Sequence, residues 1–251
     1  FEIGLYLFEL LAIKLPHVLI WGLFAIFIHS FFKNFYIGFF LLLIFSIGIN
    51  FLGELGVEQM IFRFNNAPNT PYSDMNGYGA YLSPYYIYKL YWLLLAMAMY
   101  VLSIALCRPG VPSSLHERIQ SIKKEFNPIL SACFSVLMIA FIAMGSWIWY
   151  TNNILNENLS SKQLEKRLAD WEKNYGKFEG IPQPRIVDVS VDLDLFPETR
   201  DFEAVGSYKL INKTTSAIDS IHVDHGSYIS SFSFDAEHTL VLEDDCMNYD
   251  I

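Results

Sequence analysis

Histidines, cysteines and acidic residues are the side chains that could form a chemical site in this chain. His222 and His225, in the stretch His-Val-Asp-His, are two potential metal ligands three residues apart. On or after a strand these positions point to different faces, and no third ligand is evident, so the spacing does not favour a metal site. His116–Glu117 is the only His-Glu pair, and Arg-Ile-Gln follows it instead of the second histidine of an H-E-x-x-H motif.

The other reactive residues form no known motif either. Cys107, Cys133 and Cys246 show no C-x-x-C spacing, so neither a zinc site nor a disulfide follows. The sequence has no G-x-x-x-x-G-K-[ST] phosphate loop and no G-x-S-x-G nucleophile elbow. We therefore predict no catalytic residue, no metal ligand and no cofactor within these 251 residues.

Composition divides the chain into two halves. It is 53% hydrophobic with a mean hydropathy of +0.30, which is more apolar than an ordinary soluble domain. Residues 1–150 contain 8 Lys+Arg and 7 Asp+Glu, whereas residues 151–251 contain 9 and 19. The acidic second half argues against nucleic acid as a partner, because phosphate binding needs a basic surface.

Four apolar stretches in the first half are candidates to cross a bilayer, which takes about 20 mostly apolar residues per helix. They contain almost no charge, so core helices of a soluble domain are the less favoured interpretation. We predict an α-helical, polytopic membrane domain at residues 1–150, with the lipid bilayer as its partner. Its expected spans are residues 17–32, 35–52, 86–107 and 129–150.

Loop charges predict the orientation of these spans. The link between the third and fourth spans contains Arg108, Arg118, Lys123 and Lys124, which indicates a cytoplasmic loop. The loop 53–84 has one cation against three acidic residues and is expected outside, as is everything after Tyr150. The tyrosines and tryptophans that open the third span and close the fourth would then lie at the same outer interface.

The polar stretch Tyr-Ser-Asp-Met-Asn-Gly, residues 72–77, precedes the third span. Asn76–Gly77 is a strong turn signal, so this stretch is expected to form a turn at the outer lip of the membrane domain. Tyr72, Asp74, Asn76 and Gly77 are candidate outer-loop contacts that could dock the outer domain, although turn formation alone is the simpler role.

Ionisable residues inside spans are functional candidates by default. Lys89 lies about one turn inside the third span, where it could pair with a neighbour, but snorkelling to the interface is favoured because the end of the span is near. His17 and His29, near the two ends of the first span, are expected in helix packing or at an interface more than in a proton relay.

Two shorter helical patterns flank the spans. Residues 3–13 are apolar and stop before Lys14 and Pro16, which favours a lipid-facing or interfacial helix over a signal peptide. Because the chain begins at Phe1 without an initiator methionine, we expect a segment of a longer protein. The cytoplasmic link has a capping-box spacing at Ser114–Glu117 and then a helical apolar pattern. A cytoplasmic coupling helix there would contain Leu115, Arg118, Ile119 and Ile122.

The second half begins with a predicted amphipathic helical linker at residues 151–180, which Pro182 and Pro184 end. Residues 187–195 then alternate strictly between apolar and polar, and residues 202–211 read as the next strand. Further strands are expected at residues 218–223, 228–234 and 238–243. We predict that residues 181–251 are the start of an antiparallel, all-β, sandwich-like domain that is truncated here.

The chain resembles a group of large bacterial membrane proteins in three places. These are Tyr72-Ser-Asp-Met-Asn-Gly77 with Lys89-Leu-Tyr-Trp92, the strand sequence at residues 185–198, and Gly206-Ser-Tyr-Lys-Leu-Ile-Asn-Lys-Thr214. In these proteins, a type-2 ABC exporter permease domain is joined to an extracytoplasmic zinc aminopeptidase of the aminopeptidase N family. The resemblance covers essentially the whole chain. It implies the last permease helices followed by the opening strands of the amino-terminal β domain.

The resemblance implies a multi-pass protein of the bacterial cytoplasmic (inner) membrane with its carboxy-terminal domain outside. The intact parent would be a zinc metallopeptidase that hydrolyses the first peptide bond of peptides, with zinc activating a water molecule. The zinc ligands and catalytic residues of the family match no position here and would lie beyond Ile251.

Two alternatives stay open. In one, the permease half is the working part, an ATPase subunit binds near residues 113–126, and a peptide or lipid is exported. In the other, the outer β domain has no metal site and is a non-catalytic binding module. Permeases of this class usually work as pairs, so a homodimer is implied as well.

Overall fold

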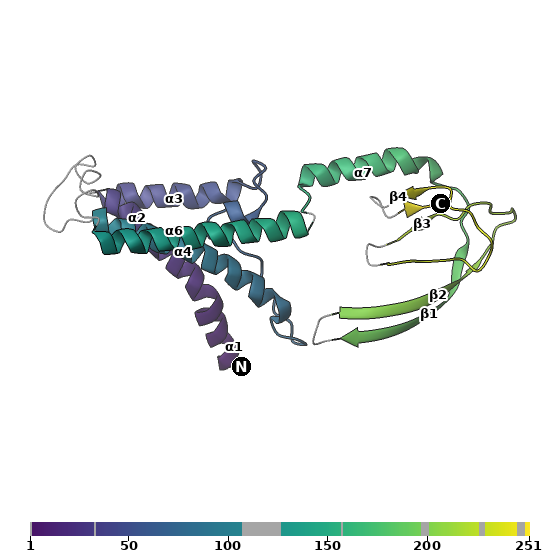
Figure 1. Cartoon of the computed structure of the whole chain (residues 1–251), viewed down its shortest axis with the longest axis horizontal. Helices are drawn as coiled ribbons and strands as arrows, with labels where there is room; N and C mark the ends of the chain where they lie inside the picture. Colours follow the sequence, from purple (N-terminus) through teal and green to yellow (C-terminus); the bar gives the residue numbers. More distant parts are fainter. Residues whose placement is uncertain are drawn as a thin grey trace. The chain divides into compact units, whose positions relative to one another are not determined.

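The computed structural model describes residues 2–32, 34–106, 127–156, 158–196, 201–225, 229–244 and 249–251. The chain forms two compact units, Phe1–Ser160 and Ser161–Ile251, which we name the membrane unit and the β unit (Figure 1). The expected linker 151–180 is divided between them, because Thr151–Leu155 continues the preceding helix and Ser161–Tyr175 belongs to the β unit.

The membrane unit is helical. Residues Ile3–Phe31 form one uninterrupted helix, so the separate interfacial helix expected at residues 3–13 is instead the first part of the first span. Pro16 does not end it; the residues just before it, Glu9–Lys14, are π-helical, a local irregularity of the kind by which a helix accommodates a proline in its interior. In chain order the elements are α1 Ile3–Phe8, η1 Glu9–Lys14, α2 Leu15–Phe31, α3 Phe35–Phe51, η2 Met60–Phe62, η3 Gly79–Tyr81, α4 Leu82–Leu106, α6 Pro128–Tyr150 and η4 Thr151–Leu155.

Within the described residues, three helices are long and apolar enough to cross a membrane. They are Ile3–Phe31 with 29 residues, Gly79–Leu106 with 28 and Pro128–Leu155 with 28. These three match the predicted apolar stretches and have the length and composition that crossing a bilayer requires. Helix α3 is apolar but has only 17 residues, a length of about 25 Å at 1.5 Å per residue, which is the lower limit for a bilayer core.

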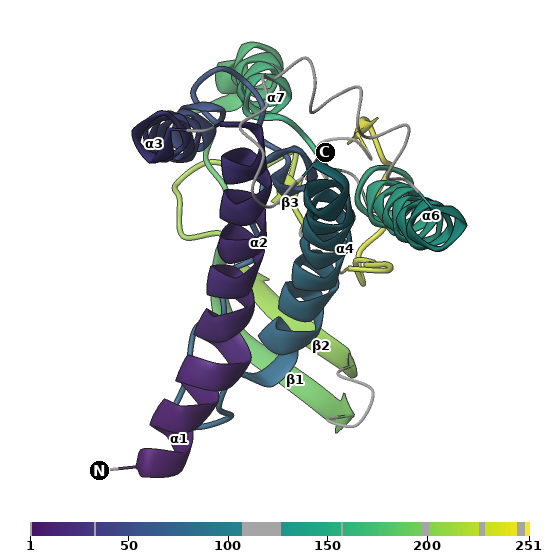
Figure 2. The ribbon, with the colours of Figure 1, turned by 90° about the vertical axis from the view of Figure 1, so that its left-hand side faces the viewer.

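Helices α2 and α4 pack side by side, with α3 against α2 and α6 against α4 (Figure 2). Glycine permits close approach in both outer contacts. A Cβ atom on Gly38 of α3 would lie 3.0 Å from Nε2 of His29, and one on Gly145 of α6 would lie 2.9 Å from the Tyr91 ring. Small residues at helix contacts are a common device in membrane bundles, because dispersion contacts drive association there.

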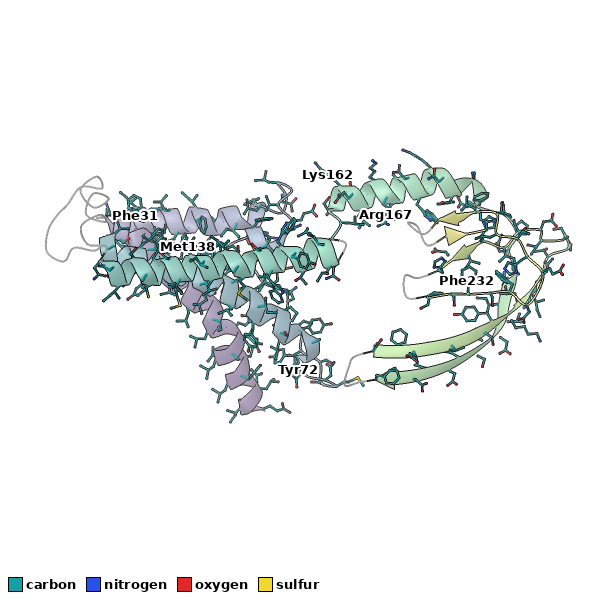
Figure 3. All side chains as sticks on the ribbon, in the orientation of Figure 1. Phe31, Tyr72, Met138, Lys162, Arg167 and Phe232 are labelled. Atoms are coloured by element: carbon teal, nitrogen blue, oxygen red, sulfur yellow. The ribbon has the colours of Figure 1, made fainter. Side chains whose placement is uncertain are left out.

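The segment of residues 53–78, which we call the outer loop, inserts side chains between these helices. Ile61 and Phe64 are buried in the main apolar cluster with Ile20, Trp92 and Ile148. We call the end of the unit that carries this segment the loop end. Tyr72 lies there, whereas Phe31 lies at the opposite end of the unit (Figure 3).

The β unit begins with α7 Ser161–Tyr175 and η5 Gly176–Phe178, as the amphipathic pattern predicted. An antiparallel hairpin follows, formed by β1 Arg185–Phe196 and β2 Asp201–Ile211. Val191 pairs with Gly206 and Leu195 with Phe202, so the alternating apolar residues gather on one face. The register shifts between Ile186 and Asp188, which identifies a β-bulge at Val187 that the strict alternation did not reveal.

The sandwich expected for residues 181–251 is not shown. Beyond the hairpin, the described residues form only the two-residue strands β3 Val223–Asp224, β4 Glu243–Asp244 and β5 Tyr249–Asp250, in the order β3-β5-β4. The strands predicted at 218–223 and 238–243 are reduced to these short pairings, and residues 229–234 form no strand. An alternating pattern needs a second layer to cover its apolar face, and within the described residues the hairpin has none.

Candidate functional site

Lys89 is the most unusual side chain of the membrane unit. It lies two turns into α4 and is only 5% exposed, so it is buried and does not snorkel outward as the sequence favoured. Its Nζ donates to the backbone oxygen of Asn65 at 2.8 Å and to Asn65 Oδ1 at 2.9 Å. Nδ1 of His17 lies 3.1 Å from Nζ of Lys89. Lys89 therefore pairs with neighbouring residues, which was the other possibility that the sequence left open.

These contacts satisfy the lysine completely. An ammonium group has three N–H donors and no acceptor, and here three acceptors surround it. His17 Nδ1 can accept from an ammonium only when the imidazole is neutral with its proton on Nε2. All three acceptors are uncharged, so dipoles alone replace the water that burial removes. The Tyr85 ring, 5.4 Å from Nζ, adds a cation–π contact.

Asn65 is the centre of this arrangement. It is 2% exposed and has φ of +57°, in the left-handed region that few residues other than glycine and asparagine adopt. This conformation directs its backbone oxygen and its Oδ1 to the same ammonium. Its Nδ2 donates to the backbone oxygen of His17 at 2.9 Å, which also links the outer loop to α2. We call Lys89, Asn65 and His17 the lysine clamp.

Other hydrogen bonds fasten the outer loop on both sides of the clamp. Trp92 Nε1 on α4 donates to the backbone oxygen of Asn66 at 3.0 Å. Gln59 Nε2 donates to Asn153 Oδ1 of η4 at 2.6 Å. The Tyr85 hydroxyl donates to the backbone oxygen of Ile13, so the start of α4 is also tied to the first helix. The loop is therefore joined to three helical segments that are distant in sequence.

Aromatic packing reinforces these bonds. The Phe64 ring contacts four rings on the helices, with centroid distances of 5.4 Å to Trp21, 4.8 Å to Phe24, 5.7 Å to Phe45 and 5.3 Å to Trp92. Such tilted and edge-to-face pairs stabilise beyond the area they bury. Phe64 is next to Asn65 in sequence, so adjacent loop residues supply the aromatic contacts and the hydrogen bonds of the lysine clamp.

The predicted turn at residues 72–77 is confirmed. Ser73 and Gly77 exchange backbone hydrogen bonds of 2.9 Å and 2.7 Å, and Gly77 has φ of +63°, which favours glycine. Asp74 and Asn76 are exposed, and the Tyr72 ring packs on Tyr78 at 5.2 Å. Tyr72, Asp74, Asn76 and Gly77 thus share one turn, and none of the hydrogen bonds of Lys89 involves them.

The remaining predicted site residues are not brought into this region. Leu115, Arg118, Ile119 and Ile122 lie outside the described residues. His222 and His225 pack separately in the β unit, with the rings of Phe178 at 4.8 Å and Phe232 at 5.7 Å. Among the residues that the structure describes, no three His, Cys, Asp or Glu side chains gather in a way that could hold a metal ion.

Sequence reasoning identified Lys89 but missed its partners. Asn65 lies in the stretch Phe-Asn-Asn-Ala-Pro, which reads as an ordinary loop. The usable signal was an asparagine, a residue that tolerates the left-handed region, directly after the mostly apolar stretch of the loop at positions 60–64. Comparison of the chain with protein-family models, curated proteins and solved structures finds no match.

Proposed function

We propose that this chain is the membrane-embedded anchor and the opening β segment of an extracytoplasmic zinc aminopeptidase of the bacterial inner membrane. The observation that carries the proposal is the combination of three potential membrane spans with a separate unit that contains a long antiparallel hairpin. The residues that resemble the family at 72–92 include the end of the outer loop and the start of α4. Those at 185–214 include β1 and β2.

In this proposal α3 is a fourth, short span. An even number of crossings returns the chain to its starting side after α6, which agrees with the cation-rich link between α4 and α6 on the cytoplasmic side. The β unit is then extracytoplasmic. The proposed substrates are peptides outside the membrane.

The described residues do not fit a zinc site, because they contain no suitable group of ligands. In the proposal, as the resemblance implies, zinc is held by a region of a longer protein beyond Ile251. No residue of this chain is assigned a role in peptide hydrolysis. Its contribution is to fix the peptidase to the membrane.

The test is to purify the longer protein and this chain side by side in detergent and to measure bound zinc and cleavage of an aminoacyl substrate. The proposal expects zinc and activity in the longer protein and neither in the chain. A longer protein without zinc-dependent cleavage contradicts it, and the β unit would then belong to a binding module only.

One observation favours a second candidate, an ABC exporter permease whose outer β unit is a non-catalytic binding module. A plain anchor needs only apolar helices, whereas a buried lysine in a span is costly and is commonly functional. This candidate expects an ATPase subunit, and a second copy of the chain, to copurify under gentle conditions. Purification without any ATPase subunit counts against it.

A further inference from the structure

A groove lies at the loop end of the membrane unit, between η2 of the outer loop, α4 and about the last three turns of α6. Its volume is about 640 Å³, within the range of small-molecule binding sites. Ile61 and Phe62 form one side, Tyr91 the floor, and Ile142 and Trp149 the other side. The groove belongs to one unit, so its walls are fixed by the contacts described above.

The floor of the groove is rigidly built. The Tyr91 ring stacks on Phe141 with a centroid distance of 4.5 Å and an interplanar angle of 17°. It also occupies the space beside Gly145, where a Cβ atom would approach to 2.9 Å. Tyr91 is 7% exposed and Ile61 is 4% exposed, so both are held in place by packing.

The lining is almost wholly apolar. Ile142 is 59% exposed and Trp149 is 44% exposed, so the groove opens on the outward face of α6. This face belongs to the candidate span Pro128–Leu155, whose most apolar 18-residue stretch has no buried residue. Water is a poor occupant of an apolar groove at membrane depth, because it would lack hydrogen-bond partners.

The groove matches a lipid chain better than a protein helix. A helix is about 10 Å in diameter with side chains and rises 5.4 Å per turn, so a groove of this volume holds only about one and a half turns. Trp149 and Tyr150 line it at the end of α6, and such amphipathic rings lie at headgroup level in membranes. A phospholipid fits this arrangement, with its polar end at these rings and its apolar part among Phe62, Tyr91 and Ile142.

We propose that this groove is a binding site for one acyl chain of a bilayer phospholipid, retained through purification. The site does not depend on the proposed peptidase or export role. The groove differs from a general lipid-contacting surface because the outer loop closes one of its sides. This wall limits exchange of the bound acyl chain with the surrounding bilayer.

The test counts phosphatidylcholine molecules retained by the protein. Nanodiscs of phosphatidylcholine are dissolved in mild detergent, and native mass spectrometry measures bound lipid on the unmodified protein and two variants. Ile142→Trp fills the groove. Ile139→Trp is the matched control, because Ile139 is 67% exposed, lies one turn earlier on α6 and does not line the groove.

We expect one retained lipid on the unmodified protein and on Ile139→Trp. On Ile142→Trp we expect roughly tenfold weaker retention, which corresponds to about two fewer CH2 groups of the acyl chain buried in the groove. Equal retention by all three proteins overturns the proposal. So does a dimer that Ile142→Trp dissociates without loss of lipid, because a second copy would then occupy the groove. If Ile142→Trp does not fold, Ile142→Phe is measured instead, and full retention by it likewise overturns the proposal.

Discussion

The outer loop and the β1–β2 hairpin differ in how their side chains are covered. The outer loop is irregular in backbone, yet Ile61, Phe64 and Asn65 are buried by helices from distant parts of the sequence. The hairpin is regular over 11 and 12 residues, yet almost every position on both faces is exposed. In these two regions, regular secondary structure and burial of side chains are therefore separate properties, because the irregular loop has a buried core and the regular hairpin has none.

The largest expected effect is at Phe64, which carries the apolar part of the loop contact. Phe64→Ala removes a ring that contacts four other rings, and large-to-small core changes of this kind cost about 3–5 kcal/mol. Thermal unfolding of the membrane unit in detergent measures the loss. Phe62→Ala is the control, because Phe62 is 58% exposed two residues earlier. Equal losses for both variants would contradict the burial difference.

The next effect is at the lysine clamp. Lys89→Met preserves an unbranched chain but leaves both oxygens of Asn65 without their donor. Because the variant also removes a buried charge, which offsets part of this cost, the net loss is expected to be about 1–3 kcal/mol. A lower melting temperature is expected, by about 2–4 °C for each kcal/mol lost. The matched control is Lys14→Met, because Lys14 is exposed and pairs with Glu9 at 3.6 Å, a contact of about 0–1 kcal/mol.

A smaller effect separates backbone strain from hydrogen bonding at Asn65. Asn65→Ala and Asn65→Gly both lose the side-chain bonds to Lys89 and His17, but only alanine is strained at φ of +57°. Asn65→Gly is expected to be more stable than Asn65→Ala by about 1 kcal/mol. Chemical denaturation of the two variants measures this difference, and a more stable alanine variant would show that the left-handed conformation is not used.

The smallest effect is expected on the hairpin. Leu193 is 49% exposed opposite Ala204, so Leu193→Thr should change the stability of this chain by less than about 0.5 kcal/mol. In a longer protein with a second β layer, the same substitution should cost several times more. Circular dichroism of both proteins during heating measures the comparison. A large loss in this chain alone would mean that the exposed face is covered.

The sequence predicted what depends on local pattern and missed what depends on distant contacts. Apolar length predicted spans at residues 86–107 and 129–150, close to α4 and α6, because such a pattern is a property of neighbouring residues. For the same reason, alternation at residues 187–195 predicted β1. The pairing of Lys89 with Asn65 and His17 was not predictable, since its members are 24 and 72 positions apart from the lysine. The sandwich was overpredicted, because alternation indicates a face that needs cover and not the layer that supplies it.

The most direct test of the lysine clamp is amide hydrogen exchange over residues 53–78 in detergent, compared between the unmodified protein and Lys89→Met. The clamp predicts slow exchange near Asn65 in the unmodified protein and faster exchange throughout the outer loop in the variant, with the helix Pro128–Leu155 unchanged away from its contact with Gln59. Equal exchange in the two proteins would contradict the claim that Lys89 fastens this loop to the helices.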